Sequence, residues 1–173
     1  MQAAASVVVF VLSASAVLAE DWTGGFLGGQ VGYSNIDPSD NRVDTDGFTY
    51  GVHAGYDHDF GDWVLGGELD YDRLNIDIGS GTTAVNADHL YRAKLRLGYD
   101  FGDALGYVVA GPARLKTSAG SYTEAFYGLG VSVLMSPSWS ITGEYLYQDF
   151  NDAAGGGVDA KIQSFTLRAA FRF

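Results

Sequence analysis

The sequence predicts an all-β protein, an eight-stranded antiparallel up-and-down transmembrane β-barrel. Its clearest strand runs from Lys161 to Phe173, where every second side chain from Phe165 is apolar and those between are small or charged. A repeat of two residues indicates a strand with one dry and one wet face. Similar segments recur along the chain, joined by short turns that alternate with longer polar loops, as in outer-membrane barrels.

Eight segments come close to the roughly 9–11 residues that a tilted barrel strand requires. In order they are Trp22–Tyr33, Phe48–Asp57, Trp63–Asn75, His89–Asp100, Leu105–Leu115, Tyr122–Leu134, Trp139–Gln148 and Lys161–Phe173. Short turns are predicted at His58–Asp62, Phe101–Ala104 and Met135–Ser138. Longer loops are predicted at Ser34–Gly47, Ile76–Asp88, Lys116–Ser121 and Asp149–Ala160.

The turns after the second and fourth strands have similar sequences. Phe60-Gly61-Asp62 follows one Gly-Tyr-Asp triplet, and Phe101-Gly102-Asp103 follows the other. Asp and Gly are ordinary turn formers. Because nothing gives these aspartates the spacing of a cation-binding loop, no metal site and no cofactor are predicted.

One face of the predicted strands is aliphatic and the other is small and charged. The aliphatic face comprises Val52, Ala54, Leu65, Leu95, Leu97, Val109, Leu129 and Val131. The glycines of the opposite face are Gly51, Gly55, Gly66, Gly98, Gly106, Gly128 and Gly130. A closed barrel of about eight strands has just enough interior for side chains, so interior charges need small neighbours. The glycines therefore indicate that the polar face points inward.

Aromatic side chains gather toward both ends of the aliphatic face. Trp63, Trp139, Phe101, Phe171 and Phe173 mark the end with the short turns, and Tyr50, Tyr71, Tyr91 and Tyr147 lie toward the other end. Aromatic girdles around an aliphatic band are typical of a bilayer-spanning barrel. A soluble lipocalin-like barrel, with its apolar face inside, is the alternative reading of the same alternation.

The polar face carries both signs of charge at matching heights. Glu68 and Glu144 lie several residues from a short turn, and Arg96 and Arg168 lie at similar heights on neighbouring strands. Asp72 continues the set toward the long loops. Because buried charges need partners, we predict a lumen charge network. Its members are Glu68, Asp70, Arg92, Lys94, Arg96, Glu144 and Arg168.

The first 19 residues are apolar or small, and the first charged residue is Glu20. This predicts a signal peptide over residues 1–19 and a mature barrel domain over residues 20–173, although no Lys or Arg follows Met1. A short buried helix is the alternative. No other stretch approaches the roughly 20 apolar residues of a membrane-spanning helix. The formal charge of -11 argues against nucleic acid as a partner.

The chain resembles the small outer-membrane β-barrel proteins of Gram-negative bacteria, the OmpA-like and opacity-type surface antigens, which are porin-like. The resemblance rests on the glycine-rich segment Trp22–Tyr33 and on the terminal Phe171-Arg172-Phe173. It implies localisation in the outer membrane, with outer-membrane lipids and lipopolysaccharide as surroundings. It also implies insertion by the barrel-assembly machinery, with Phe171 and Phe173 in the assembly signal.

Three functions follow as hypotheses. The first is a structural or surface-antigen role without catalysis, with acidic outer loops that contain Asp37, Asp40, Asp44 and Asp46. The second is a narrow passive channel for ions or small solutes, with the charge network as its constriction. The third is a lipid A-modifying enzyme, which needs a nucleophile beside a base. Its candidate bases are His53 on the lumen side, His58 in a turn and His89 on the outward face, none with an evident nucleophile.

Overall fold

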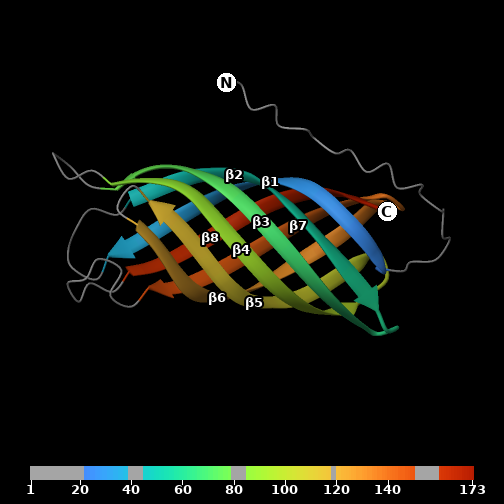
Figure 1. Ribbon diagram of the computed structural model, residues 1–173. Helices are drawn as coiled ribbons and strands as arrows, with labels where there is room; N and C mark the ends of the chain where they lie inside the picture. The colour runs from blue at the N-terminus through green and yellow to red at the C-terminus, as the bar shows by residue number, and fades with distance from the viewer. Residues whose placement is uncertain (1–21, 39–44, 79–84, 118–119, 151–159) are drawn as a thin grey trace, which may run out of the picture.

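The computed structural model is a single closed sheet of eight antiparallel strands, β1-β2-β3-β4-β5-β6-β7-β8 (Figure 1). It describes residues 22–38, 45–78, 85–117, 120–150 and 160–173. The strands are β1 (Gly24–Pro38), β2 (Thr45–Asp59), β3 (Trp63–Ile78), β4 (Val85–Asp100), β5 (Ala104–Thr117), β6 (Gly120–Ser136), β7 (Trp139–Phe150) and β8 (Ala160–Arg172). The predicted all-β barrel and its strand order are confirmed.

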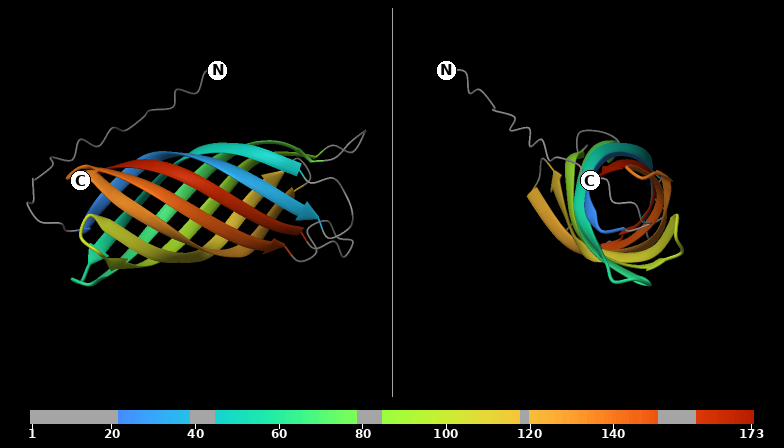
Figure 2. Two further views of the ribbon diagram at one scale, coloured as in Figure 1. Left: turned by 180° about the vertical axis from the view of Figure 1, so that it is seen from behind. Right: turned by 90° about the vertical axis from the view of Figure 1, so that its right-hand side faces the viewer.

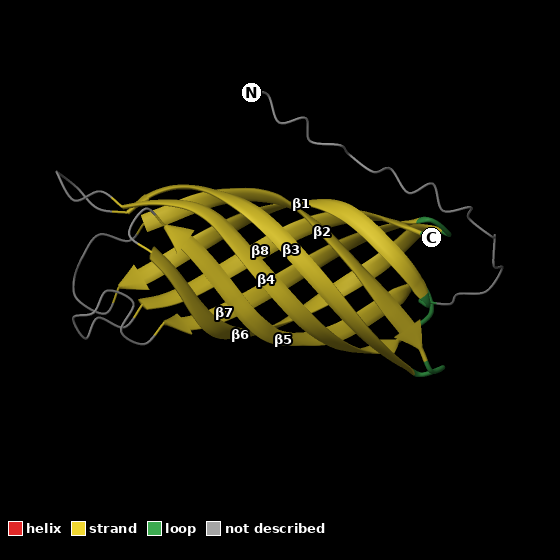
Figure 3. Cartoon of the chain, viewed as in Figure 1, coloured by secondary structure: helices red, strands yellow, loops and turns green. Residues whose placement is uncertain are grey.

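The barrel closes where β1 pairs with β8 (Figure 2). At this seam Gly25 N donates to Phe173 O and Phe173 N donates to Gly25 O, both at 2.9 Å. Each strand is bonded to two neighbours, so the sheet has no open edge. Strands connected by loops and turns make up the described chain, and it contains no helix long and apolar enough to cross a membrane (Figure 3).

The two ends of the barrel differ in their connections. Tight turns at residues 60–62, 101–103 and 137–138 lie at the end where β8 finishes, which we name the turn end (Figure 1). The opposite end is the loop end. The two similar turns have the same geometry, since Gly61 N donates to Asp59 Oδ1 and Gly102 N to Asp100 Oδ1, each at 2.7 Å. Gly61 and Gly102 have φ of 107° and 87°, which glycine adopts at little cost.

The strands extend further toward the loop end than the sequence predicted. β1 continues to Pro38 and β2 begins at Thr45, so much of the predicted first loop is strand. Polar residues in these segments made strand and loop indistinguishable. At the turn end, β2 reaches Asp59, which places His58 in a strand and not in the predicted turn. Asp40 and Asp44 of the predicted acidic loop lie outside the described residues, as does the predicted signal peptide.

The outward face is apolar over most of its height. Leu69, Leu95, Val108 and Leu129 are each more than half exposed. Aromatic side chains bound this band toward the turn end, where Trp63 meets Tyr99 edge-on at 5.3 Å between ring centroids and Trp139 meets Phe171 at 5.5 Å. Such a band between aromatic girdles fits a bilayer, as predicted.

Strand β5 faces the opposite way from the prediction. Tyr107 pairs with Gly98 and Val109 with Arg96, so both side chains point into the lumen and are buried. Gly106, predicted inside, faces outward, and Val109, predicted outside, faces inward. The reason is that residues 104–113 contain no charged residue, so both faces of β5 are apolar or small and alternation cannot orient it.

Candidate functional site in the barrel lumen

The inward positions of β3, β4, β7 and β8 bring the predicted charges together in the lumen. We name the following set the lumen network: Asp57, Glu68, Asp70, Asp72, Arg92, Lys94, Arg96, Glu144, Arg168 and Arg172. Each member is at most 8% exposed and forms at least one ion pair. Its five carboxylates and five cations are matched in number, so the formal charge of -11 is carried by residues outside the network.

Four of these side chains connect opposite walls of the barrel. Arg168 of β8 donates to Glu68 Oε1 of β3 at 2.6 Å and to Glu144 Oε2 of β7 at 3.0 Å. Lys94 of β4 contacts Glu68 Oε1 at 3.1 Å and also pairs with Glu144. Two of these contacts, Arg168 with Glu68 and Lys94 with Glu144, bridge strands that are not neighbours in the sheet, so they span the width of the lumen.

Toward the loop end, the network continues through Asp70, Asp72 and Arg92. Arg92 Nη1 lies 2.5 Å from Asp72 Oδ2 and 3.7 Å from Asp70 Oδ2. Lys94 Nζ lies 2.7 Å from Asp70 Oδ2. Gln30 of β1 donates to Asp72 Oδ1 at 2.6 Å, so the carboxylate is bonded from two sides. A buried charge pair is tolerated only when its remaining hydrogen-bonding atoms also find partners.

Tyr107 is a member of the site that the sequence analysis missed. Its hydroxyl donates to Glu144 Oε2 at 2.7 Å, and the Arg96 guanidinium lies 4.2 Å from its ring centroid. Arg96 also donates to Glu68 Oε2 at 3.1 Å. Tyr107 therefore contacts Glu144 directly and Glu68 through Arg96. It does so from β5, a strand that contributes no charge at this height. Tyr107 could have been identified from the sequence only if β5 had been oriented correctly.

A second cluster fills the lumen near the turn end. Trp22 is fully buried, and its Nε1 donates to Asp100 Oδ1 and to Gly102 O, both at 3.1 Å. Arg172 donates to the carbonyl of Trp22 and, at 3.2 Å, to Asp57 Oδ2. Its guanidinium lies 4.9 Å from the Trp22 ring. The indole thus fills the lumen at the turn end, a position that the predicted strand Trp22–Tyr33 did not indicate.

Glycines provide the space that the network occupies, as predicted for the polar face. A Cβ at Gly130 would come within 2.4 Å of the Tyr107 ring, and one at Gly66 within 2.0 Å of Asp57 Oδ1. No larger residue fits at either position without displacing a network side chain. Little free space is therefore left in the lumen around these two glycines.

The described contacts of His53 and His89 are with aromatic side chains. His53 is buried in the lumen as predicted, and its ring lies 6.1 Å from that of Phe26. On the outward face, His89 Nδ1 is hydrogen-bonded to Tyr71 Oη at 2.9 Å. Among the described residues, no group of three or more His, Cys, Asp or Glu side chains has a metal-binding arrangement.

The whole described barrel has known relatives. Residues 3–173 match the family described as "Outer membrane protein beta-barrel domain". The chain is 25% identical over 220 residues to the 31 kDa outer-membrane immunogenic protein of Brucella melitensis biotype 1, covering 98% of this chain and 92% of that protein.

Two solved structures share the fold. Neisserial surface protein A superposes with a TM-score of 0.59 and 16% identity over 87% of this chain and 98% of that one. The attachment invasion locus protein Ail of Yersinia pestis gives a TM-score of 0.51 and 19% identity over 87% and 99%. At these identities the likeness concerns the fold alone.

Proposed function

The chain belongs to the outer membrane protein beta-barrel domain family, and on that premise we propose that it is a non-catalytic surface protein whose lumen is closed by its own side chains. It is an outer-membrane β-barrel whose interior carries a buried charged network. The observation that carries the proposal is the pair of bonds across the lumen, Arg168 with Glu68 and Lys94 with Glu144.

These cross-lumen bonds support closure for two reasons. Each crossing side chain is at most 5% exposed, so the network leaves little room for a column of water. Separating paired buried charges is also costly, because each charge left without its partner loses several kcal/mol of compensation. The Trp22 cluster would act as a second barrier at the turn end.

A narrow channel is the second candidate. It is favoured by the Nε atoms of Arg92, Arg96 and Arg168, which are buried and have no acceptor among the described residues. Such donors are normally satisfied by water, so the lumen would hold some water molecules. Isolated waters satisfy these donors without a continuous path, which is why we favour the closed barrel.

Planar-bilayer recording separates the two candidates. The refolded wild-type protein should insert without discrete conductance steps if the lumen is closed. Reproducible steps of fixed size, in a preparation whose heat-modifiable migration on a denaturing gel shows a folded barrel, would favour the channel.

We also propose that the protein is a surface antigen whose loop end is exposed outside the cell. It is supported by the printed description of the Brucella relative as immunogenic and by the long connections at the loop end. An epitope tag inserted within residues 151–159 should be accessible to antibody on intact cells. The same tag at the turn of residues 137–138 should react only after permeabilisation, and the reverse pattern would reject the orientation.

We also infer that Phe171 and Phe173 form part of the assembly signal. Both rings face outward from the last strand and lie stacked, 6.4 Å apart between centroids. An outward aromatic pair is free to be recognised before the barrel closes. Phe173→Ala should lower the amount of assembled barrel in cells while leaving refolding in detergent unchanged. An equal loss in both settings would indicate a purely structural role.

Lipid A modification is not supported by the contacts of His53 and His89, which involve Phe26 and Tyr71. We therefore propose no catalytic residue. The mass spectrum of lipid A from cells that overexpress the protein should match that of control cells. A new acylation or deacylation product would overturn the non-catalytic assignment.

A further inference from the structure

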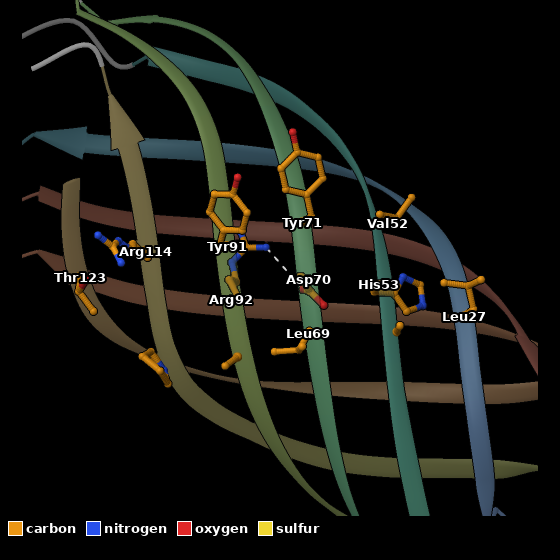
Figure 4. A pocket seen from close by; sticks show the side chains of 13 residues that line it. Leu27, Val52, His53, Leu69, Asp70, Tyr71, Tyr91, Arg92, Arg114 and Thr123 are labelled. Atoms are coloured by element: carbon orange, nitrogen blue, oxygen red, sulfur yellow. Dashed lines mark ion pairs between the residues drawn. The ribbon is translucent and has the colours of Figure 1, made fainter. Parts of the chain in front are cut away.

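A hollow of about 510 Å³ crosses the outward face of the barrel (Figure 4). Most of its lining side chains face outward and are apolar, among them Leu27, Val52, Leu69, Ala93 and Pro112. A bilayer-facing surface of this kind contacts acyl chains. The hollow is therefore a site in which one lipid acyl chain could bind on the outward surface of the barrel.

The hollow forms where the β4–β5 ladder is interrupted. The register pairs Arg92 with Ala113 and next Leu95 with Ala110, and it gives Gly111 and Pro112 no partner on β4. Proline has no N–H to donate, which explains the interruption. Ala93, an outward lining residue of β4 at this level, has a short side chain. The outward surface is consequently recessed at this point relative to the strands on either side.

The hollow runs along the barrel axis. It begins at Leu27, close to the turn end of β1, and reaches Arg114 and Thr123, which lie toward the loop end of β5 and β6. The strands are tilted, so a line parallel to the axis crosses them in succession, and Figure 4 shows the labelled side chains arranged in this order. Lipid acyl chains also extend along the membrane normal, so one chain would lie lengthwise in the hollow.

Cationic groups lie at and just beyond its loop end: Arg114 lines the hollow, and Arg73 lies two residues past the lining residue Tyr71 on β3. Among residues whose side chains are described, Arg73 and Arg114 are the two Lys or Arg side chains that face outward. They belong to β3 and β5, two strand spacings apart, and Arg73 lies level with Lys116, two residues from Arg114, so the two Cα atoms are separated by roughly 12 Å. No described carboxylate lies within ion-pair distance of either guanidinium. In a chain with a formal charge of -11, this is a local site for anions.

We propose that this hollow binds a diphosphorylated glycolipid of the lipid A type, with one acyl chain along Leu69 and Ala93 and its phosphates at Arg73 and Arg114. Two separate cations suit a headgroup with two separate phosphates better than one with a single phosphodiester. Arginine is well matched to phosphate because its planar fork donates two parallel hydrogen bonds. The inference rests on the proposed function, since the loop end must face the outer leaflet.

Native mass spectrometry of the detergent-refolded protein tests the site. Hexa-acylated lipid A, its monophosphorylated form and phosphatidylglycerol are titrated separately. Lipid A should bind most tightly. The double variant Arg73→Gln/Arg114→Gln should weaken lipid A binding by about 30-fold, and each single variant by about fivefold. Wild-type binding that is equal for all three lipids would overturn the proposal without any variant.

A matched pair of variants tests the acyl-chain part. Ala93→Trp fills the hollow, whereas Ala169→Trp adds the same bulk to the outward face of β8, outside the hollow. The first should weaken lipid A binding and the second should leave it unchanged. Equal effects, or unchanged binding in the double arginine variant, would refute the site. Because the titration takes place in detergent, its failure is distinguishable from failure of the proposed orientation, which the epitope tags report.

Discussion

The inward faces of β3–β4 and of β5–β6 line the same lumen with different chemistry. β3 and β4 contribute Glu68, Asp70, Asp72, Arg92, Lys94 and Arg96, all buried and charged. β5 and β6 contribute mainly apolar or small groups, such as Leu105, Val109 and Phe126. The charged strands supply the bonds that cross the barrel, while β5 and β6 pack apolar side chains around them. The closed lumen that we propose requires both halves.

The difference also teaches why buried charge is tolerated here. A carboxylate removed from water needs several donors, and Glu144 receives them from Arg168, Lys94 and Tyr107. Tyr107 is the residue of the apolar half that bonds to the polar network, through Glu144. Substitutions on the two sides should therefore destabilise the barrel for different reasons. On β3 and β4 they leave a buried charge unpaired, whereas on β5 and β6 they remove packing or a hydroxyl group.

The largest effect is expected from Arg168→Met. It removes the cation shared by Glu68 and Glu144 and leaves buried carboxylates with too few partners. The free energy of unfolding should fall by about 3–5 kcal/mol. Urea titration of the refolded barrel in detergent measures this change. Arg114→Met, on the outward face, is the control and should alter the stability little; equal losses would show that Arg168 does not stabilise the network.

Tyr107→Phe isolates the contribution of β5. It keeps the ring beneath Arg96 and removes the 2.7 Å hydrogen bond to Glu144. A hydrogen bond to a charged group is worth about 1.5–3 kcal/mol, and the unfolding free energy should fall by that amount. Tyr145→Phe removes an exposed hydroxyl that donates to Gln163 at 2.9 Å and should cost much less. If the two variants are equally stable, Tyr107 is not coupled to the network.

A smaller effect is expected from Gly130→Ala. The new Cβ would lie 2.4 Å from the Tyr107 ring, so the ring or β6 must shift. Overpacking of this kind costs about 1–3 kcal/mol, and Tyr107 keeps its bond to Glu144 only through such a shift. Gly67→Ala faces open space on the outward side and should be neutral or slightly stabilising in the same urea titration. Stabilisation by both would mean that the lumen is loosely packed.

Prediction from the sequence succeeded where one face carried charge. In β3 the alternation of Glu68, Asp70 and Asp72 with Leu69 and Tyr71 orients the strand uniquely, and the structure places these residues as expected. Since a slip of one residue would turn three carboxylates toward lipid, the register is strongly specified. The resemblance to small outer-membrane barrels, now supported by the family match, extended this reasoning to the whole chain.

Prediction failed where local sequence does not distinguish the alternatives. β5 has apolar residues on both faces, and only its pairing with β4 and β6 orients Tyr107. The sequence analysis placed Trp22 in the first strand, whereas the structure places it before β1. Its contacts with Asp100 and Gly102 join residues far apart in the sequence, and periodicity does not report such contacts. The outward hollow depends on a ladder interruption at Pro112 that becomes visible only when its neighbours are placed.

We propose that paired side chains crossing from β3–β4 to β7–β8 close the lumen, with Trp22 as a second barrier. Single-channel recording tests it most directly when the wild type is compared with a variant that combines Trp22→Ala with alanine at Glu68, Lys94, Glu144 and Arg168. That variant removes two carboxylates and two cations, so the charge balance is kept. We predict no conductance from the wild type and small, steady conductance steps from the folded variant. Conductance from the wild type, or silence from the folded variant, would contradict the account.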